Sequence, residues 1–123
     1  MNLKRLVNKA IKAKPLPSLS WLYGDYYSPY YSLMYLLAGT IRNGLLIELG
    51  VHKGRGIASL AISNPHNRVV GLDTTWWDGL GSVINTFPNV WFLNQASMPV
   101  PEFIINLGSE IGLLHIDTEH SYS

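Results

Sequence analysis

The sequence has no cysteine among its 123 residues, and only 14% of the residues are charged. Without cysteine, the chain has no disulfide, no thiolate nucleophile and no cysteine-bound zinc. The composition, 47% hydrophobic and 11% aromatic, excludes a disordered tail, a coiled coil and a collagen-like chain, and it permits a buried core. So few charges over so much apolar surface also predict that another chain, or residues beyond this sequence, cover part of it.

Charge is unevenly distributed along the chain. Residues 1–14 contain five lysines and arginines and no acid, whereas the remainder contains four bases and eight acids. Because nucleic-acid-binding domains usually spread their bases over the folded surface, we expect no nucleic-acid partner. The uncharged stretches 26–41 and 79–101 are interrupted by proline and polar residues, so neither predicts a membrane span. These features indicate a soluble, cytoplasmic protein.

Residues 1–43 predict an N-terminal helical segment. Its first helix is amphipathic and basic and ends before Pro15; it is interpreted either as an arm for a membrane surface or an anionic partner, or as a helix packed on its own or a neighbouring subunit. A loop follows, and then Ser28 and Pro29 predict the start of a second helix that runs to about Ala38. This tyrosine-rich helix is apolar almost all round, which is typical of core or oligomer packing or of an aromatic substrate pocket.

Residues 44–123 predict a second unit in which short apolar runs alternate with helical segments. This alternation is typical of βαβ units and a parallel sheet, and therefore of an α/β fold. The expected strands span residues 45–49, 68–73, 90–93 and 112–117, and the expected helices span residues 57–62, 79–86 and 101–107.

A glycine-rich turn follows the first strand. Glu48 lies near the end of this strand, and the glycines after it have neither the spacing of the dinucleotide fingerprint nor that of the P-loop. An acid beside a glycine turn and a helix N-terminus suits a ligand that has both an ammonium and a carboxylate, such as an amino acid. Asp73 ends the second strand, where an acid can accept hydrogen bonds from ribose hydroxyls. An amino acid joined to a ribose describes S-adenosylmethionine.

The residues Glu-x-Gly-x-x-x-Gly-x-Gly, followed by Gly-Leu-Asp, resemble class I S-adenosylmethionine-dependent methyltransferases. Residues 115–122, His-Ile-Asp-Thr-Glu-His-Ser-Tyr, resemble the IDG-x-H-x-Y signature of a subgroup of small-molecule O-methyltransferases, with Thr118 in place of its glycine. The resemblance covers about Gly44 to Tyr122. It implies a Rossmann-like sheet with strand order 3-2-1-4, helices on both faces, and O-methylation of a small hydroxylated molecule.

The resemblance also implies roles for individual residues. The methionine end of S-adenosylmethionine would be surrounded by Glu48, Gly50, Val51, His52, Gly54 and Gly56. Asp73 would bind the ribose, and Thr74 and Ser97 would lie at the adenine. Asp117 would bind a divalent cation such as Mg²⁺, and His120 would be the general base. We expect His115, inside the fourth strand, to be a packed core residue.

The family's sheet usually has seven strands, and this sequence supplies four, so we expect a chain truncated at its C-terminal end. Three interpretations stay open: an enzyme that has lost its tail, a non-catalytic S-adenosylmethionine-binding module, or a structural domain completed by another subunit. An uncovered edge strand invites pairing with another chain. We therefore expect a homo-oligomer formed through that edge or through the tyrosine-rich helix.

Overall fold

The computed structural model describes residues 2–13, 19–23, 28–95, 102 and 110–116. Within them, four parallel strands form one sheet in the order β3-β2-β1-β4. The strands are β1 (Leu45–Leu49), β2 (Val69–Leu72), β3 (Val90–Leu93) and β4 (Ile111–Ile116), and the helices are α1 (Leu3–Lys12), α2 (Ser20–Tyr23), α3 (Pro29–Ala38), α4 (Arg55–Ser63) and α5 (Leu80–Thr86). This architecture confirms the predicted α/β, Rossmann-like fold and its strand order.

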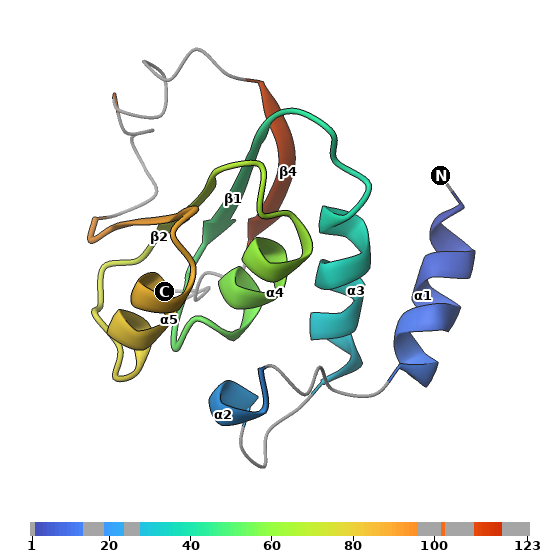
Figure 1. Cartoon of the computed structure of the whole chain (residues 1–123), viewed down its shortest axis with the longest axis horizontal. Coiled ribbons are helices and arrows are strands. Elements are labelled where there is room, and N and C mark those ends of the chain that lie inside the picture. Colours follow the sequence, from blue (N-terminus) through green and yellow to red (C-terminus); the bar gives the residue numbers. More distant parts are fainter. Residues whose placement is uncertain (1, 14–18, 24–27, 96–101, 103–109, 117–123) are drawn as a thin grey trace, which may run out of the picture.

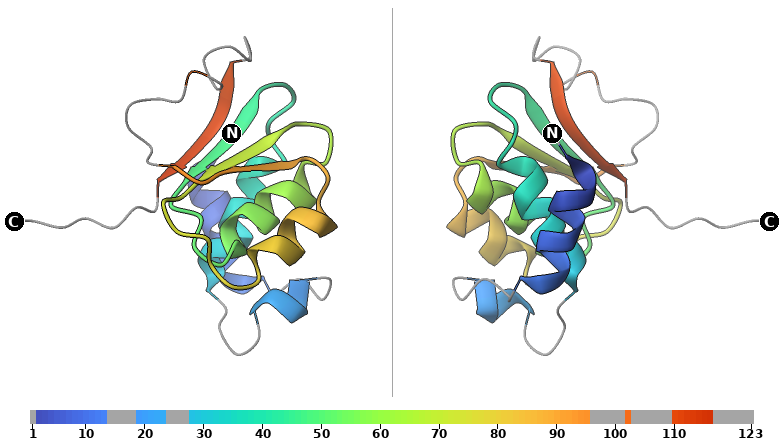
Figure 2. Two further views of the ribbon diagram at one scale, coloured as in Figure 1. Left: turned by 90° about the vertical axis from the view of Figure 1, so that its left-hand side faces the viewer. Right: turned by 90° about the vertical axis from the view of Figure 1, so that its right-hand side faces the viewer.

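The described helices lie on one side of the sheet, with α1 against α3 at the edge of the helical layer (Figures 1 and 2). Side chains alternate along each strand, so Leu46 and Val69 belong to the main core under the helices. Ile47 and Val70 belong to a second cluster on the opposite face. The helix expected over residues 101–107, which would cover that face, lies outside the described residues except for Glu102.

The expected start of α3 is confirmed in detail. Ser28 is the N-cap, its side-chain oxygen accepts a hydrogen bond from the Tyr30 backbone N–H at 3.3 Å, and Pro29 is the first helical residue. The helix ends at Ala38, as predicted. The short helix α2 lies where a loop was expected, because four residues are too few to show a helical pattern of apolar side chains.

Close contact between the helical layer and the sheet depends on Gly71 in β2. A Cβ atom at this position would lie 2.5 Å from both Val51 Cγ2 and Ile57 Cδ1. The missing side chain therefore lets the turn after β1 and the first turns of α4 lie directly on β2. This packing fixes the N-terminal end of α4 next to the carboxyl ends of β1 and β2.

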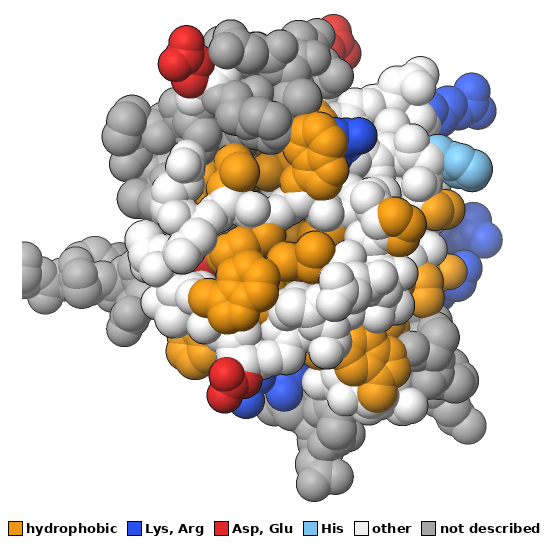
Figure 3. Space-filling model, turned by 60° about the vertical axis from the view of Figure 1, so that its left-hand side comes forward, with side chains coloured by type: hydrophobic (Ala, Val, Ile, Leu, Met, Phe, Trp, Pro, Cys, Tyr) orange, Lys and Arg blue, Asp and Glu red, His pale blue; other side chains and the backbone are white. Residues whose placement is uncertain are grey.

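The outermost strand next to β1 is β4, and three of its apolar side chains are exposed in the described part of the chain: Ile111, Leu114 and Ile116. A second group of exposed apolar side chains includes Trp76 and Trp77, which precede α5. Figure 3 views the side that carries α5 and shows hydrophobic side chains gathered there. None of the described helices is long and apolar enough to cross a membrane.

Candidate functional site

The turn from β1 to α4 shapes the centre of the site. Gly50 and Gly54 have φ angles of 85° and 91°, a backbone region that glycine adopts readily, and His52 between them also has a positive φ of 53°. Gly54 is the N-cap of α4 and supplies no side-chain hydrogen bond to the helix. The turn therefore brings the start of α4, with its partial positive charge, close to the end of β1.

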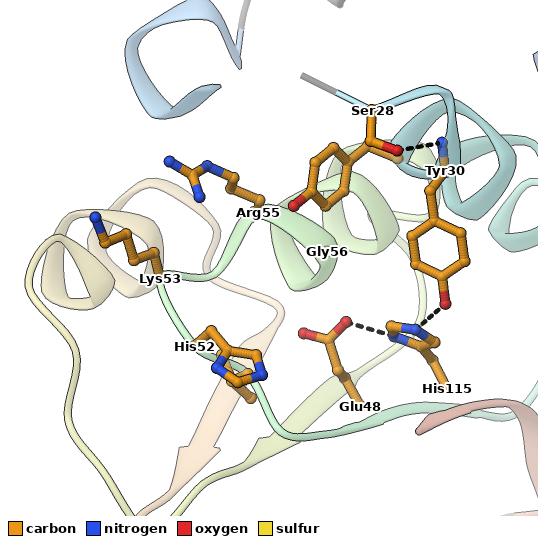
Figure 4. A pocket seen from close by; sticks show the side chains of 10 residues that line it. Ser28, Tyr30, Glu48, His52, Lys53, Arg55, Gly56 and His115 are labelled. Carbon is orange, nitrogen blue, oxygen red and sulfur yellow. Dashed lines mark hydrogen bonds and ion pairs between the residues drawn. The ribbon is translucent and has the colours of Figure 1, made fainter. Parts of the chain in front are cut away.

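A cavity of about 270 Å³ lies beside this turn. It is enclosed by the end of β1, the turn, the start of α4, the start of α3 and the end of β4 (Figure 4). Its lining residues are Ser28, Tyr30, Tyr31, Glu48, Val51, His52, Lys53, Arg55, Gly56 and His115. Four residues predicted to surround a methionine moiety, Glu48, Val51, His52 and Gly56, therefore line one cavity.

Three side chains in the cavity form a hydrogen-bonded chain (Figure 4). The Glu48 Oε2 atom lies 2.7 Å from Nδ1 of His115, and Nε2 of His115 is hydrogen-bonded to the hydroxyl of Tyr30. Glu48 is 2% exposed, His115 8% and Tyr30 43%. The chain therefore runs from a buried carboxylate to a tyrosine that is partly exposed.

The sheet register brings Glu48 and His115 together. The two residues are direct partners in the β1–β4 pairing, so their side chains leave the sheet on the same face. Gly56 makes room for the carboxylate, because a Cβ atom there would overlap Glu48 Oε2 and lie 3.1 Å from Glu48 Cδ. The Ser28 cap fixes the first turn of α3 and with it the position of Tyr30.

Asp73 follows β2 and has a different environment. Its Oδ2 accepts a hydrogen bond from the His52 backbone N–H at 2.9 Å, and its Oδ1 accepts one from Thr75 N–H at 3.0 Å. Partial burial raises the pKa of Asp73, but these N–H groups, the His52 side chain and the Val51 N–H together outweigh it, so the pKa is below its ordinary value. The half-buried carboxylate thus ties the glycine turn to the segment after β2.

The residues after Asp73 form the outer part of the site. Thr74 is exposed, and the Asn94 amide, oriented with its nitrogen toward the turn, donates to the Thr74 carbonyl at 3.1 Å. The Trp77 ring lies 5.7 Å from the His52 ring, and the Trp76 ring lies 5.3 Å from the Phe92 ring, measured between centroids. These contacts give the exposed tryptophans partners within this chain.

Three predicted site residues, Ser97, Asp117 and His120, lie outside the described residues. Within the described part of the chain, no group of three or more histidine and acidic side chains could hold a metal ion. The expected Mg²⁺ site therefore has no support among these residues. The role implied for Asp117 stays a prediction.

The sequence did not predict the contributions of Lys53, Arg55 and His115 to this cavity, and a pocket lined by tyrosines was one of the interpretations given for the helix that carries Tyr30. His115 is buried as expected, but it also pairs with Glu48. The strand order 3-2-1-4 could have indicated this pair. It places β1 beside β4, and Glu48 and His115 each lie one position before the end of their strand. The cavity thus combines an acid with basic side chains and a helix N-terminus, which suits a ligand that carries both charges.

Comparison with known proteins supports the fold. No family model and no curated protein matches the sequence. Two solved structures of CalS11 are similar, one described as a TDP-rhamnose 3'-O-methyltransferase of calicheamicin biosynthesis and the other as a calicheamicin methyltransferase. They align with TM-scores of 0.58 and 0.56 and identities of 20% and 18%, over 94% of this chain in both cases.

This chain shares the Rossmann-like fold of these methyltransferases. The alignments cover 64% and 65% of the two CalS11 chains, so this chain spans just under two thirds of their length. At such low sequence identity, the likeness concerns the arrangement of helices and strands. Function must therefore be argued from the side chains of the cavity.

Proposed function

We propose that this chain binds S-adenosylmethionine and carries the donor-binding part of a methyltransferase that acts on a hydroxyl group of a small molecule. The observation that carries the proposal is the cavity at the carboxyl end of β1, where the Glu48 carboxylate faces the first turn of α4. Ligands of open α/β sheets bind at this edge, where neighbouring connections run in different directions. The fold shared with O-methyltransferases supports the same conclusion.

The methionine end fits the chemistry of this cavity. Its ammonium would lie near the buried carboxylate of Glu48, whose Oε2 is paired with His115. Its carboxylate would lie toward the first turn of α4, with Lys53 and Arg55 at the same wall. Gly50, Gly54 and Gly56 would let the ligand approach the backbone closely.

The ribose would lie at Asp73, outside this cavity. The backbone N–H groups of Val51, His52 and Thr75 face the Asp73 carboxylate, which offers about four lone-pair sites, so a ribose hydroxyl could use a further one. Thr74 would lie beside the adenine, and Ser97 is predicted to contribute there. When bound, S-adenosylmethionine supplies an electrophilic methyl group on sulfur. The protein's part is to hold the donor, to orient the acceptor hydroxyl and to accept its proton.

An alternative proposal is a non-catalytic binding module or structural domain that forms a homo-oligomer. The exposed apolar side chains on β4 favour it, because edge strands of this kind pair with other chains. Size-exclusion chromatography with light scattering tests this alternative. A dimer expected from pairing through β4 should dissociate when Leu114 is changed to lysine, and a monomeric unmodified chain contradicts the alternative.

Titration calorimetry with S-adenosylmethionine tests the proposed function. We expect saturable binding, and we expect Asp73→Ala to weaken it at least about tenfold, the equivalent of about 1.4 kcal/mol. The matched control is Asp78→Ala, which removes an exposed acid from the same segment and should leave the dissociation constant unchanged. Circular dichroism should first establish that both variants are folded. Absence of heat at millimolar ligand contradicts the proposal.

A further inference from the structure

The chain Glu48–His115–Tyr30 has a use beyond holding a ligand. We propose that it is a proton relay in which Tyr30 Oη is the general base that takes the proton of the acceptor hydroxyl. The inference rests on the proposed function for the nature of that acceptor. It assigns a catalytic residue on α3, far in sequence from the terminal motif whose His120 the family resemblance favours for this role.

The hydrogen-bond partners define the tautomer of His115. An ionised carboxylate can only accept hydrogen bonds, so Nδ1 of His115 donates its proton to Glu48 Oε2. In a neutral imidazole, the other nitrogen then carries a lone pair. Nε2 of His115 therefore accepts a hydrogen bond from the hydroxyl of Tyr30, and this direction is the one a base needs.

Exposure changes in the order that a relay requires. The carboxylate and the imidazole are buried, at 2% and 8% exposure, and the tyrosine is 43% exposed and lines the cavity. A buried acid that orients an imidazole, which in turn activates an accessible hydroxyl, is the arrangement of the serine-hydrolase triad. Tyr30 is therefore the member that can touch a substrate, and the other two are positioning residues.

His115 lines a cavity that also holds several charged and titratable groups. The charged and titratable groups around the imidazole come from several elements: Glu48 on β1, Tyr30 and Tyr31 on α3, and His52, Lys53 and Arg55 at the turn and the start of α4. Glu48 is in direct contact with the imidazole and supplies the negative charge that stabilises an imidazolium. The basic side chains of His52, Lys53 and Arg55 are suited to binding the carboxylate of a ligand.

The proposed reaction moves one methyl group and one proton. The acceptor oxygen forms a bond to the methyl carbon, and the electron pair of the broken carbon–sulfur bond stays on sulfur. The O–H proton of the acceptor passes to Tyr30 Oη as the phenolic proton passes to Nε2 of His115. The resulting imidazolium is paired with Glu48, and its proton returns through Tyr30 to water after the product leaves. Base catalysis of this kind is worth about 10²–10⁴-fold in rate.

Acetylation by N-acetylimidazole, followed by peptide mass spectrometry, tests the relay without any methyl donor. In this reaction the acetyl carbon bonds to the tyrosine oxygen, imidazole leaves, and the phenolic proton passes to the base. We expect His115→Gln to slow the acetylation of Tyr30 at least about tenfold, a threshold set below the about 10²–10⁴-fold effect of general-base catalysis. Tyr35, on the same helix but outside the cavity, is the matched internal control, and its rate should not change.

Nitrogen-15 spectra of the histidine rings provide a second test, on the unmodified protein. At a pH where imidazoles are neutral, we expect His115 to carry its proton on Nδ1 and a lone pair on Nε2, with the signal assigned through His115→Gln. A proton on Nε2, or a Tyr30 acetylation rate that is the same in His115→Gln, overturns the relay. Neither measurement involves S-adenosylmethionine, so the relay and the proposed function can fail separately.

Discussion

Glu48 and Asp73 lie at the carboxyl ends of the neighbouring strands β1 and β2, yet their carboxylates bind different partners. Glu48 is buried in β1 and binds the His115 side chain, whereas Asp73 is half-buried after β2 and accepts backbone N–H groups of His52 and Thr75. The sequence presents both as carboxylates at strand ends. Glu48 therefore positions a side chain inside the cavity, while Asp73 fixes the backbone around it.

Removing the buried acid should have the largest effect on stability. Glu48→Ala leaves the His115 ring buried without its acceptor and opens a gap, so we expect a loss of about 3 kcal/mol in the free energy of unfolding. Glu48→Gln is the matched control, because its side-chain oxygen can still accept from Nδ1, and we expect it to lose about 1 kcal/mol. Urea unfolding followed by tryptophan fluorescence measures both. Equal stability of Glu48→Ala and the unmodified protein contradicts the role given to this pair.

The space around Glu48 can be tested from the other side, at Gly56. A methyl group at Gly56 would overlap the Glu48 carboxylate, so Gly56→Ala should destabilise the protein by about 2 kcal/mol. The same substitution at Gly81, in α5, is the control. There the nearest atom to the added Cβ, Trp76 Cζ2, lies 3.7 Å away, and the change should stabilise the helix by about 0.5 kcal/mol. Thermal unfolding measures both variants. A lower melting temperature for Gly56→Ala and a higher one for Gly81→Ala support the close contact between Gly56 and Glu48, and an unchanged melting temperature for Gly56→Ala argues against it.

Changing Asp73 should have a smaller, pH-dependent effect on the free energy of unfolding. Asp73→Asn keeps one acceptor oxygen but replaces the other with a donor, so we expect a loss of about 1 kcal/mol near neutral pH. Because the pKa of Asp73 is lowered in the folded state, its ionisation stabilises the fold above the unfolded-state pKa of about 3.9. This contribution is lost as pH falls through the folded-state pKa.

Urea unfolding of the unmodified protein and of Asp73→Asn, repeated at decreasing pH, measures this difference. The gap in stability between the two proteins should narrow in acid and remain constant near neutrality. A gap that persists unchanged below the folded-state pKa would mean that the charge of Asp73 has no part in holding the turn.

Much of the fold could be predicted from local patterns. The predicted strand 90–93 and the predicted helix start at Pro29 agree with the structure, because apolar runs and a serine–proline cap are short-range signals. The strand order followed from the family resemblance. The helix α2 was missed, since Ser20–Tyr23 is a single turn, too short to show a helical pattern of apolar residues.

The site was harder to predict, because its contacts join distant parts of the chain. Glu48 and His115 are 67 positions apart, and Tyr30 and His115 are 85 apart. The strand order is sufficient to place β1 beside β4. The register that pairs Glu48 with His115, however, depends on an irregularity in the pairing between Leu45 and Leu46. A one-residue change of register would have turned the imidazole to the other face of the sheet.

We propose that the cavity beside Glu48 takes the amino-acid end of S-adenosylmethionine. Nitrogen-15 spectra of the His115 ring, recorded during titration with S-adenosylmethionine and with 5'-methylthioadenosine, test it most directly, since the second compound has the adenosine but no amino acid. We expect S-adenosylmethionine to shift the Nδ1 signal of His115 and methylthioadenosine to leave it in place. Equal shifts with both compounds, or no shift at saturating S-adenosylmethionine, would contradict the claim.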